Sequence, residues 1–320
     1  MPPVPPPSAV RAARRSRSAP ALVTAVSLVL LCGCATSLPA GGEGALAHTA
    51  GVVRVVAAED FWGSIAAQIG GAHARVVSII ANPETDPHAY EPTAADARTL
   101  ADAQVAVLNG AGYDPWMQHL LAADGGTRTV LDVGDLVGVA PGGNPHLWYD
   151  PGFVARYADA LTVDLQRADP ADRAYFAARR AAYGRVGLAG YHAESARIRA
   201  DFAGTPVGAS ESIVVYLCRA LGLDLVTPPS FLRAISEGTD VSAADTATID
   251  RQIARRAIAV YLENTQNVTP DVQAQVTAAR ATGIPVVPVT ETLQPAGASF
   301  QAWQTSQLDA LDTALEHTRG

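Results

Sequence analysis

The stretch VVRVVAAEDFWGSIAAQI, from Val52 to Ile69, contains the repeating unit of the predicted fold. Its first six residues, up to Ala57, are mostly apolar and β-branched, which favours a buried strand. Apolar residues then recur at helical spacing from Phe61 to Ile69, which predicts a helix. Short apolar strands between helices are typical of a parallel sheet that helices cover on both faces.

The same alternation continues along the chain and then begins again near Thr205. The first series has further predicted strands at residues 75–80, 105–108 and 129–133, and predicted helices at 93–103 and 115–121. The second series has predicted strands at 207–209, 258–262 and 286–289, and predicted helices at 212–221, 245–256, 271–282 and 299–315. The sequence therefore predicts an α/β fold of two lobes, each with a central, mostly parallel sheet flanked by helices.

A different segment separates the two series. Residues from Ala171 to about Ala200 are rich in alanine and arginine and contain no proline. They predict one long rigid helix, of about 45 Å at 1.5 Å per residue, that joins the lobes. Two shorter helices, broken at the glycines between residues 184 and 190, are the alternative. The predicted organisation is an N-terminal lobe, a linking helix and a C-terminal lobe, at residues 51–168, 169–203 and 204–320.

The N-terminus has the pattern of an export signal. Four arginines precede an apolar run from Ala19 to Leu31, which is too short for an ordinary transmembrane helix. The run ends at Leu31-Cys32-Gly33-Cys34, which resembles a bacterial lipobox and implies lipid attachment at Cys34. We predict a signal peptide at residues 1–33, a flexible tether at 34–50, and an extracytoplasmic lipoprotein anchored to the cell membrane. An uncleaved anchor is the alternative.

Charge and cysteine content narrow the classes of function. The formal net charge is −8, and without the signal peptide 19 arginines face 31 acidic residues, a net charge of −12. Such an acidic chain is unsuited to nucleic acid and suits cations better than anions. Cys218 lies in an apolar helical pattern, so we expect a buried, inert thiol and no disulfide.

Two loops each place a histidine directly after a proline. They read DPHAYEP, at residues 86–92, and NPHLWYDP, at residues 144–151. Proline restricts its own φ and pushes the preceding residue toward extended geometry, so each loop presents its imidazole stiffly. Because imidazole is the commonest metal ligand, His88 and His146 are candidate ligands. Unpartnered loop histidines are the alternative.

Two carboxylates follow predicted strands of the second series, where ligands collect in open α/β sheets. Glu211 follows the strand at residues 207–209, and Glu291 follows the strand at 286–289. Two imidazoles and two carboxylates suit Zn(II), Mn(II) or Fe(II) better than Cu(I). Glu211 could instead be favoured by a helix dipole, and Glu291 could be a solvated residue at a strand end.

From about Val52 to its C-terminus, the chain resembles the zinc and manganese solute-binding lipoproteins of bacterial ABC importers. The matching motifs are Gly70-Gly71, PHAYEP at 87–92, Ala101-Asp102-Ala103, Asn109-Gly110, PHLW at 145–148 with Asp150-Pro151, Ser210-Glu211 and ISEG at 235–238. The resemblance implies that His88, His146, Glu211 and Glu291 hold one Zn(II) or Mn(II) ion between two lobes, as the transported ligand. It also implies a monomeric receptor, without catalytic activity, that delivers the ion to permease and ATPase subunits.

Two departures from the family leave the identity of the metal open. The fourth ligand is usually aspartate, whereas this chain has Glu291. Many zinc-specific members have a His-rich loop between the first two ligands, which the segment between His88 and His146 lacks. Around the site, we expect Tyr90 and Trp148 to form a wall, and Glu59 is a candidate acceptor for an imidazole N–H.

Other classes of protein fit the sequence less well. The residues GASES at 208–212 lack the last glycine of a G-x-S-x-G nucleophile elbow, and His317 is the only histidine that follows them. A metal-dependent hydrolase would need an open coordination position, which four protein ligands would fill in a four-coordinate site. A surface adhesin lipoprotein without a transport role leaves the four candidate ligands unexplained.

Overall fold

Two four-stranded parallel sheets form the framework of the computed structural model, which describes residues 51–83, 85 and 90–318. The first sheet has the order β2-β1-β3-β4, with β1 (Val53–Glu59), β2 (Ala74–Ile80), β3 (Val105–Leu108) and β4 (Thr129–Asp132). The second has the order β6-β5-β7-β8, with β5 (Pro206–Ala209), β6 (Asp224–Leu225), β7 (Tyr261–Asn264) and β8 (Val286–Val289). Every strand pair is parallel, so the predicted fold class is confirmed.

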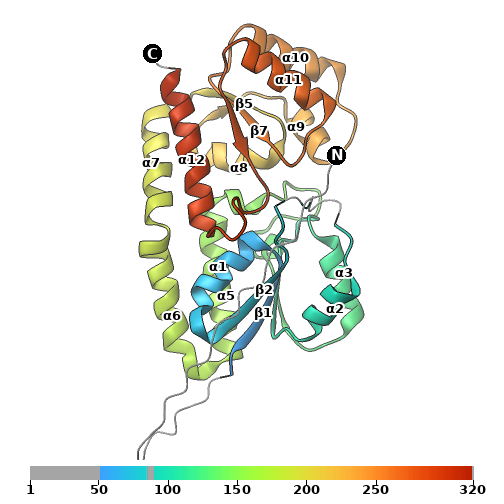
Figure 1. Cartoon of the computed structure of the whole chain (residues 1–320), viewed down its shortest axis with the longest axis vertical. Helices are drawn as coiled ribbons and strands as arrows, with labels where there is room; N and C mark the ends of the chain where they lie inside the picture. The colour runs from blue at the N-terminus through green and yellow to red at the C-terminus, as the bar shows by residue number, and fades with distance from the viewer. Residues whose placement is uncertain (1–50, 84, 86–89, 319–320) are drawn as a thin grey trace, which may run out of the picture. The chain divides into compact units, whose positions relative to one another are not determined.

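Side chains of β1 alternate between two apolar clusters, one on each face of the first sheet. Val55 and Ala57 pack on the side of α1 (Asp60–Gly70) and α5 (Pro151–Ala168). Val56 and Ala58 pack on the side of α2 (Ala94–Ala101) and α3 (Pro115–Asp124). The helices are visible on the two sides of the sheet in Figure 1. Because both faces are covered, the strand has a continuous apolar sequence.

The predicted linking helix is continuous in direction but changes its hydrogen bonding in the middle. It comprises α6 (Arg173–Ala182), a π-helical turn (Tyr183–Gly187) and α7 (Ala189–Phe202). The Leu188 N–H donates to the carbonyl of Tyr183, five residues back, at 2.9 Å. A Cβ at Gly187 would approach the Tyr183 ring to 3.0 Å, so a larger residue there would require the ring to shift. The glycine-containing segment forms a π-bulge and not a break between separate helices.

The C-terminal helix α12 (Phe300–His317) packs alongside α7 (Figure 1). The other helices are α4 (Val133–Val137), α8 (Val215–Leu221), α9 (Pro229–Ser236), α10 (Ala243–Ala254) and α11 (Pro270–Ala281). Short 3₁₀ turns lie at Gly71–His73, Leu147–Tyr149, Pro170–Asp172 and Ser212–Val214. In the described part of the chain, none of the helices combines the length and apolar character needed to cross a bilayer.

Sequence patterning missed the helices α4, α5 and α9 and the short strand β6, and it misplaced one strand. The prolines near the starts of α5 and α9 suggest loops, but in the structure they occupy the first helical turn, where proline is favourable. Asp150 caps α5 by accepting from the Gly152 N–H at 2.8 Å. β7 begins and ends later than predicted because it continues through the buried polar pair Glu263 and Asn264.

Candidate metal centre

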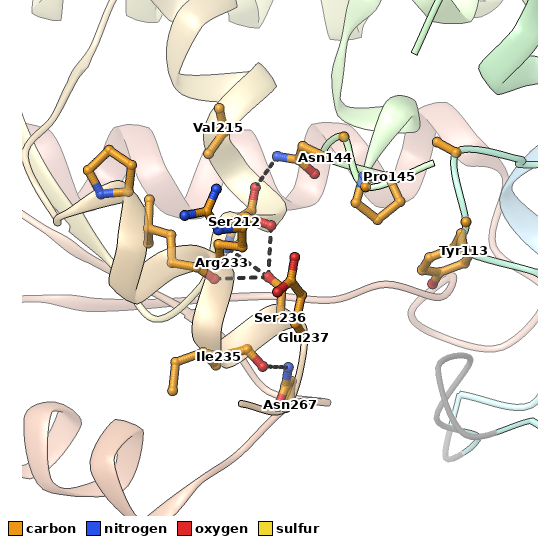
Figure 2. Close-up of a pocket in the computed structure, with 17 residues that line it drawn as sticks. Tyr113, Asn144, Pro145, Ser212, Val215, Arg233, Ile235, Ser236, Glu237 and Asn267 are labelled. Atoms are coloured by element: carbon orange, nitrogen blue, oxygen red, sulfur yellow. Dashed lines mark hydrogen bonds between the residues drawn. The ribbon is translucent and has the colours of Figure 1, made fainter. Parts of the chain in front are cut away.

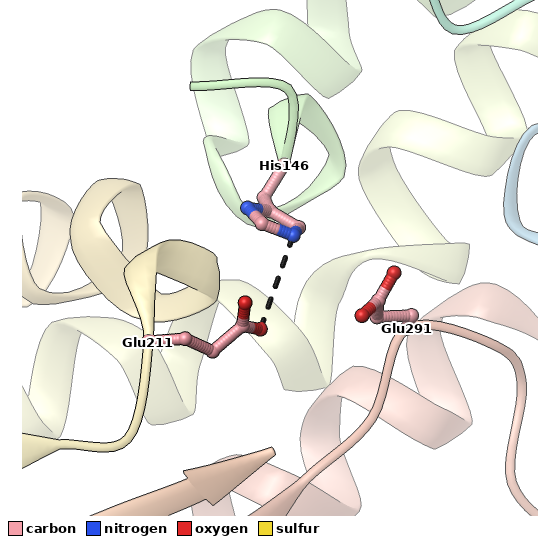
Figure 3. Close-up of side chains that lie close together, drawn as sticks. All are labelled: His146, Glu211 and Glu291. Atoms are coloured by element: carbon pink, nitrogen blue, oxygen red, sulfur yellow. Dashed lines mark ion pairs between the residues drawn. The ribbon is translucent and has the colours of Figure 1, made fainter. Parts of the chain in front are cut away.

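Three of the four predicted ligands converge on one point. One candidate ligand atom from each of His146, Glu211 and Glu291 lies within 4.8 Å of the others, and all three residues are buried. Figure 3 shows the imidazole and the two carboxylates facing a common space. The Nε2 atom of His146 lies 4.0 Å from Oε1 of Glu211. The fourth predicted ligand, His88, lies outside the described residues.

The order of the second sheet explains why the two carboxylates meet. Glu211 comes two residues after the end of β5, and Glu291 comes two residues after the end of β8. These strands flank β7 on either side, and because all three are parallel their carboxyl ends share one edge. Asn264, the last residue of β7, therefore lies between the two carboxylates.

Neutral donors engage both oxygens of each carboxylate. The Nδ2 amide nitrogen of Asn264 donates to Oε1 of Glu211 at 2.6 Å and to Oε1 of Glu291 at 2.8 Å. The Ser236 hydroxyl donates to Oε2 of Glu211 at 2.6 Å, and the Tyr113 hydroxyl donates to Oε2 of Glu291 at 2.7 Å. Each carboxyl group is thus oriented by two hydrogen bonds from neutral donors.

The contacts of His146 determine which ring nitrogen faces the carboxylates. Asn144 Oδ1 accepts from the backbone N–H of His146 at 3.1 Å and lies 2.8 Å from its Nδ1. The amide nitrogen of Asn144 donates to the backbone oxygen of Ser212 at 2.8 Å, which fixes the orientation of the amide. Nδ1 must therefore carry a proton, and in the neutral imidazole the lone pair is then on Nε2, which lies toward Glu211.

Trp148, the predicted wall residue, packs against the His146 ring. The Trp148 ring meets the imidazole edge-on, with centroids 5.3 Å apart, and stacks on Phe61 at 4.0 Å. Tyr90 has different partners: its ring lies 4.9 Å from that of Trp116, and its hydroxyl donates to Asp96. Tyr90 is partly buried and packs against the apolar cluster between the first sheet and the helices α2 and α3.

Glu59, predicted as a candidate imidazole acceptor, lies in a separate buried carboxyl pair. Burial, and then the charge of the neighbouring Asp114, raises the pKa of Glu59 well above its ordinary value. Burial also raises the pKa of Asp114 to about 6, although this carboxylate accepts from the N–H groups of Asn109 and Gly110. For His146, the acceptor is Asn144 and not Glu59.

A pocket of about 680 Å³ reaches the donors that surround the candidate ligands (Figure 2). Tyr113 and Asn144 line it from the first half of the chain, and Ser212 and Ser236 line it from the second. The Ser212 and Ser236 hydroxyls lie 2.7 Å apart, and Ser236 donates to Glu211. The pocket therefore gives solvent a path to the residues that contact His146 and the two carboxylates.

Sequence reasoning missed four residues that orient the predicted ligands: Tyr113, Asn144, Ser236 and Asn264. Asn264 had a usable signal, because it follows an apolar strand in the same way as Glu211 and Glu291. The predicted strand ended at residue 262, which put Asn264 in a loop and hid this relationship. The others come from loops and a helix end, where sequence spacing carries no comparable signal.

The fold and this cluster define a class of two-lobed binding protein, and comparison with known proteins agrees. Residues 55–314 match the family described as zinc-uptake complex component A, periplasmic. The chain belongs to this family.

Individual relatives share only a minority of their residues with this chain. The manganese-binding lipoprotein MntA of Halalkalibacterium halodurans is 29% identical over 136 residues, which are 41% of this chain and 45% of MntA. The chain thus matches less than half the length of this curated relative.

The periplasmic zinc binding protein TroA of Treponema pallidum superposes with a TM-score of 0.70 at 22% identity, over 83% of this chain and 99% of TroA. A manganese-bound variant of the periplasmic metal binding protein of Candidatus Liberibacter asiaticus gives 0.70 at 17% identity, over 82% and 99%. These structures share the fold.

Proposed function

We propose that this protein is an extracytoplasmic receptor that captures one divalent transition metal ion, Zn(II) or Mn(II), and delivers it to an ABC importer. The observation that carries the proposal is the convergence of His146, Glu211 and Glu291 from three separate loops. Family membership supports the same function, and so do the metal ions named for MntA and for the Liberibacter protein.

The donor set suits such an ion. In a four-coordinate tetrahedral site with metal–ligand distances of about 2.1 Å, two donor atoms lie roughly 3.4 Å apart. Nε2 of His146 and Oε1 of Glu211 are 4.0 Å apart, so a small approach of the two side chains would bring them to this spacing. The neutral imidazole of His146 and the carboxylates of Glu211 and Glu291 would together balance the charge of a divalent ion. His88 is the proposed fourth ligand. A site filled by four protein ligands favours capture over catalysis, because no position remains for a reactive water.

Contacts between the two halves of the chain bear on the capture step. Tyr113 from the first half donates to Glu291 in the second, and the amide of Asn144 donates to the backbone of Ser212. The Tyr149 hydroxyl donates to the backbone oxygen of Thr290 at 2.9 Å. The two halves are therefore joined beside the site, and we expect metal to order local loops without a wide hinge movement.

Anchoring and delivery complete the proposal. Lipid on Cys34 would tether the receptor to the cell membrane, and permease and ATPase subunits would receive the ion. Gly33 and Cys34, the last two residues of the lipobox, lie outside the described residues. Cys34→Ala should move the protein from the membrane fraction to the soluble fraction, and lipid labelling of the unchanged chain should be lost in this variant.

The test of metal capture is elemental analysis of the purified protein from Ala35 onward. We expect close to one equivalent of Zn or Mn, which the His88→Ala/His146→Ala variant should lose. A His119→Ala/His192→Ala variant removes two exposed histidines and should keep the metal. Absence of bound metal, together with no thermal stabilisation by added Zn(II) or Mn(II), would refute the proposal.

A further inference from the structure

The side-chain amide of Asn264 contacts both predicted carboxylate ligands. Its two N–H bonds are directed to Oε1 of Glu211 and to Oε1 of Glu291. Asn264 is fully buried, so water does not compete for these hydrogen bonds from the solvent side. A single neutral amide therefore bridges the two carboxyl groups and fixes their spacing.

The structure fixes this amide in one orientation. Its Oδ1 atom accepts from the backbone N–H of Gln266 at 3.0 Å, so the nitrogen must face the carboxylates. The backbone N–H of Asn264 donates to the Ser210 hydroxyl at 2.9 Å, and Asn264 pairs with Val289 across the sheet. The amide is thus attached to a strand between the two that precede Glu211 and Glu291, and not to a free loop.

The pattern of donors also restricts how the carboxylates can bind a metal ion. Asn264 contacts Oε1 of each, while Ser236 and Tyr113 contact the two Oε2 atoms. Each carboxylate oxygen has two lone pairs, so Oε1 can accept from Asn264 and bind the ion without any rotation of the group. Chelation by both oxygens instead requires the carboxylate to rotate until both face the ion, and this rotation competes with the hydrogen bonds that hold Oε1 and Oε2 in their present directions.

We propose that Asn264 is a positioning residue that limits Glu211 and Glu291 to one coordinating oxygen each, and so favours ions of low coordination number. This inference rests on the proposed function of metal capture. Zn(II) accepts four ligands in a tetrahedron, whereas Mn(II) favours six oxygen-rich positions. Asn264 therefore raises the preference for Zn(II) over Mn(II).

The test compares Asn264→Ala with the unchanged protein by chelator competition for Zn(II) and Mn(II), and by the visible spectrum of bound Co(II). We expect Zn(II) affinity to fall by about 10- to 100-fold, as is usual when a residue that orients metal ligands is removed. Mn(II) affinity should fall less, so the Zn:Mn affinity ratio decreases. The Co(II) bands should weaken as coordination number rises, because tetrahedral Co(II) absorbs more strongly than octahedral Co(II).

Two further variants make the result specific. Asn267→Ala removes an amide three residues after Asn264 that donates to the backbone oxygen of Ile235 at 3.2 Å, and this variant should keep the native spectrum and ratio. Asn264→Ser keeps one donor hydrogen, so it should give an intermediate ratio, and it replaces the alanine variant if that chain does not fold. A native Co(II) spectrum and an unchanged ratio in the folded Asn264 variants would overturn the inference, even if their melting temperature falls. If the unchanged protein binds none of the ions, the proposed function itself fails and this inference with it.

Discussion

The side chain of Gln266 is hydrogen-bonded to the backbone of Pro83: its Nε2 donates to the Pro83 carbonyl oxygen at 2.8 Å. Pro83 comes five residues before the predicted ligand His88. The Oε1 atom of the same side chain accepts from the backbone N–H groups of Glu291 at 2.6 Å and Thr292 at 3.1 Å. One amide therefore connects the loop of Glu291 to the segment that leads to His88.

Replacing Gln266 by alanine should weaken both folding and metal binding. The N–H groups of Glu291 and Thr292 would lose their acceptor, at a cost of about 1–3 kcal/mol in the free energy of unfolding. Urea unfolding and Zn(II) competition, measured on the same samples, check this. Gln252→Ala is the matched control, because its amide donates to the Val226 backbone at 2.7 Å, between α10 and β6. Equal Zn(II) affinity in the two variants would contradict the coupling.

Metal affinity should depend on pH through the histidines. Binding requires a neutral imidazole, so affinity should fall at least tenfold between pH 7.5 and pH 5.0 as His88 and His146 become protonated. Titration calorimetry in non-coordinating buffers measures it. A constant affinity over this range would exclude the two histidines as ligands.

The hydroxyl of Tyr113 should contribute to binding through Glu291. Burial, and then the charge of Glu291, raises the pKa of Tyr113 well above its ordinary value, so it remains a neutral donor at working pH. Tyr113→Phe leaves the ring in place and should lower Zn(II) affinity by about tenfold. Tyr261→Phe removes another buried hydroxyl, which donates to Gln275 at 2.6 Å, and should leave affinity unchanged. Similar affinities for the two variants would show that the Tyr113 hydroxyl has no role.

Asp60 should make the stability of the metal-free protein decrease as pH rises. Burial raises the pKa of Asp60 to about 7, above its unfolded value of 3.8, so the folded chain binds this proton more tightly. The stabilisation is complete below about pH 4 and is lost as pH rises through 7. Between pH 5 and pH 8, the free energy of unfolding of the wild type should fall by up to roughly 2–3 kcal/mol more than that of Asp60→Asn, because one pKa unit corresponds to about 1.4 kcal/mol.

Urea unfolding of both chains across this pH range measures the difference. Asp159→Asn, at a position whose side chain is 68% exposed, is the control and should follow the wild type. Parallel pH profiles for wild type and Asp60→Asn would show that this carboxyl does not titrate as the structure requires.

Much of the architecture was predictable because local patterns carry it. The strand from Val53 and the helix that follows are encoded by apolar spacing over eighteen residues. The cap of α2 was predictable for the same reason: Thr93 and Asp96 form a reciprocal capping box within four residues. α5 was missed because Pro151 is a helix breaker only inside a helix, and sequence alone does not show that it stands at the start.

The candidate site divides in a similar way. His146, Glu211 and Glu291 could be selected from the sequence because each lies in a recognisable loop, after a proline or after a strand. Their convergence depends on strand order, since β7 separates β5 from β8 and no local pattern specifies which strands are neighbours. The role of Asn264 follows from that same order. Residue types and local spacing thus specify which groups are available, whereas long-range packing determines which of them meet. The physical reason is that a hydrogen bond depends on ångström distances between atoms that are dozens of residues apart in the chain.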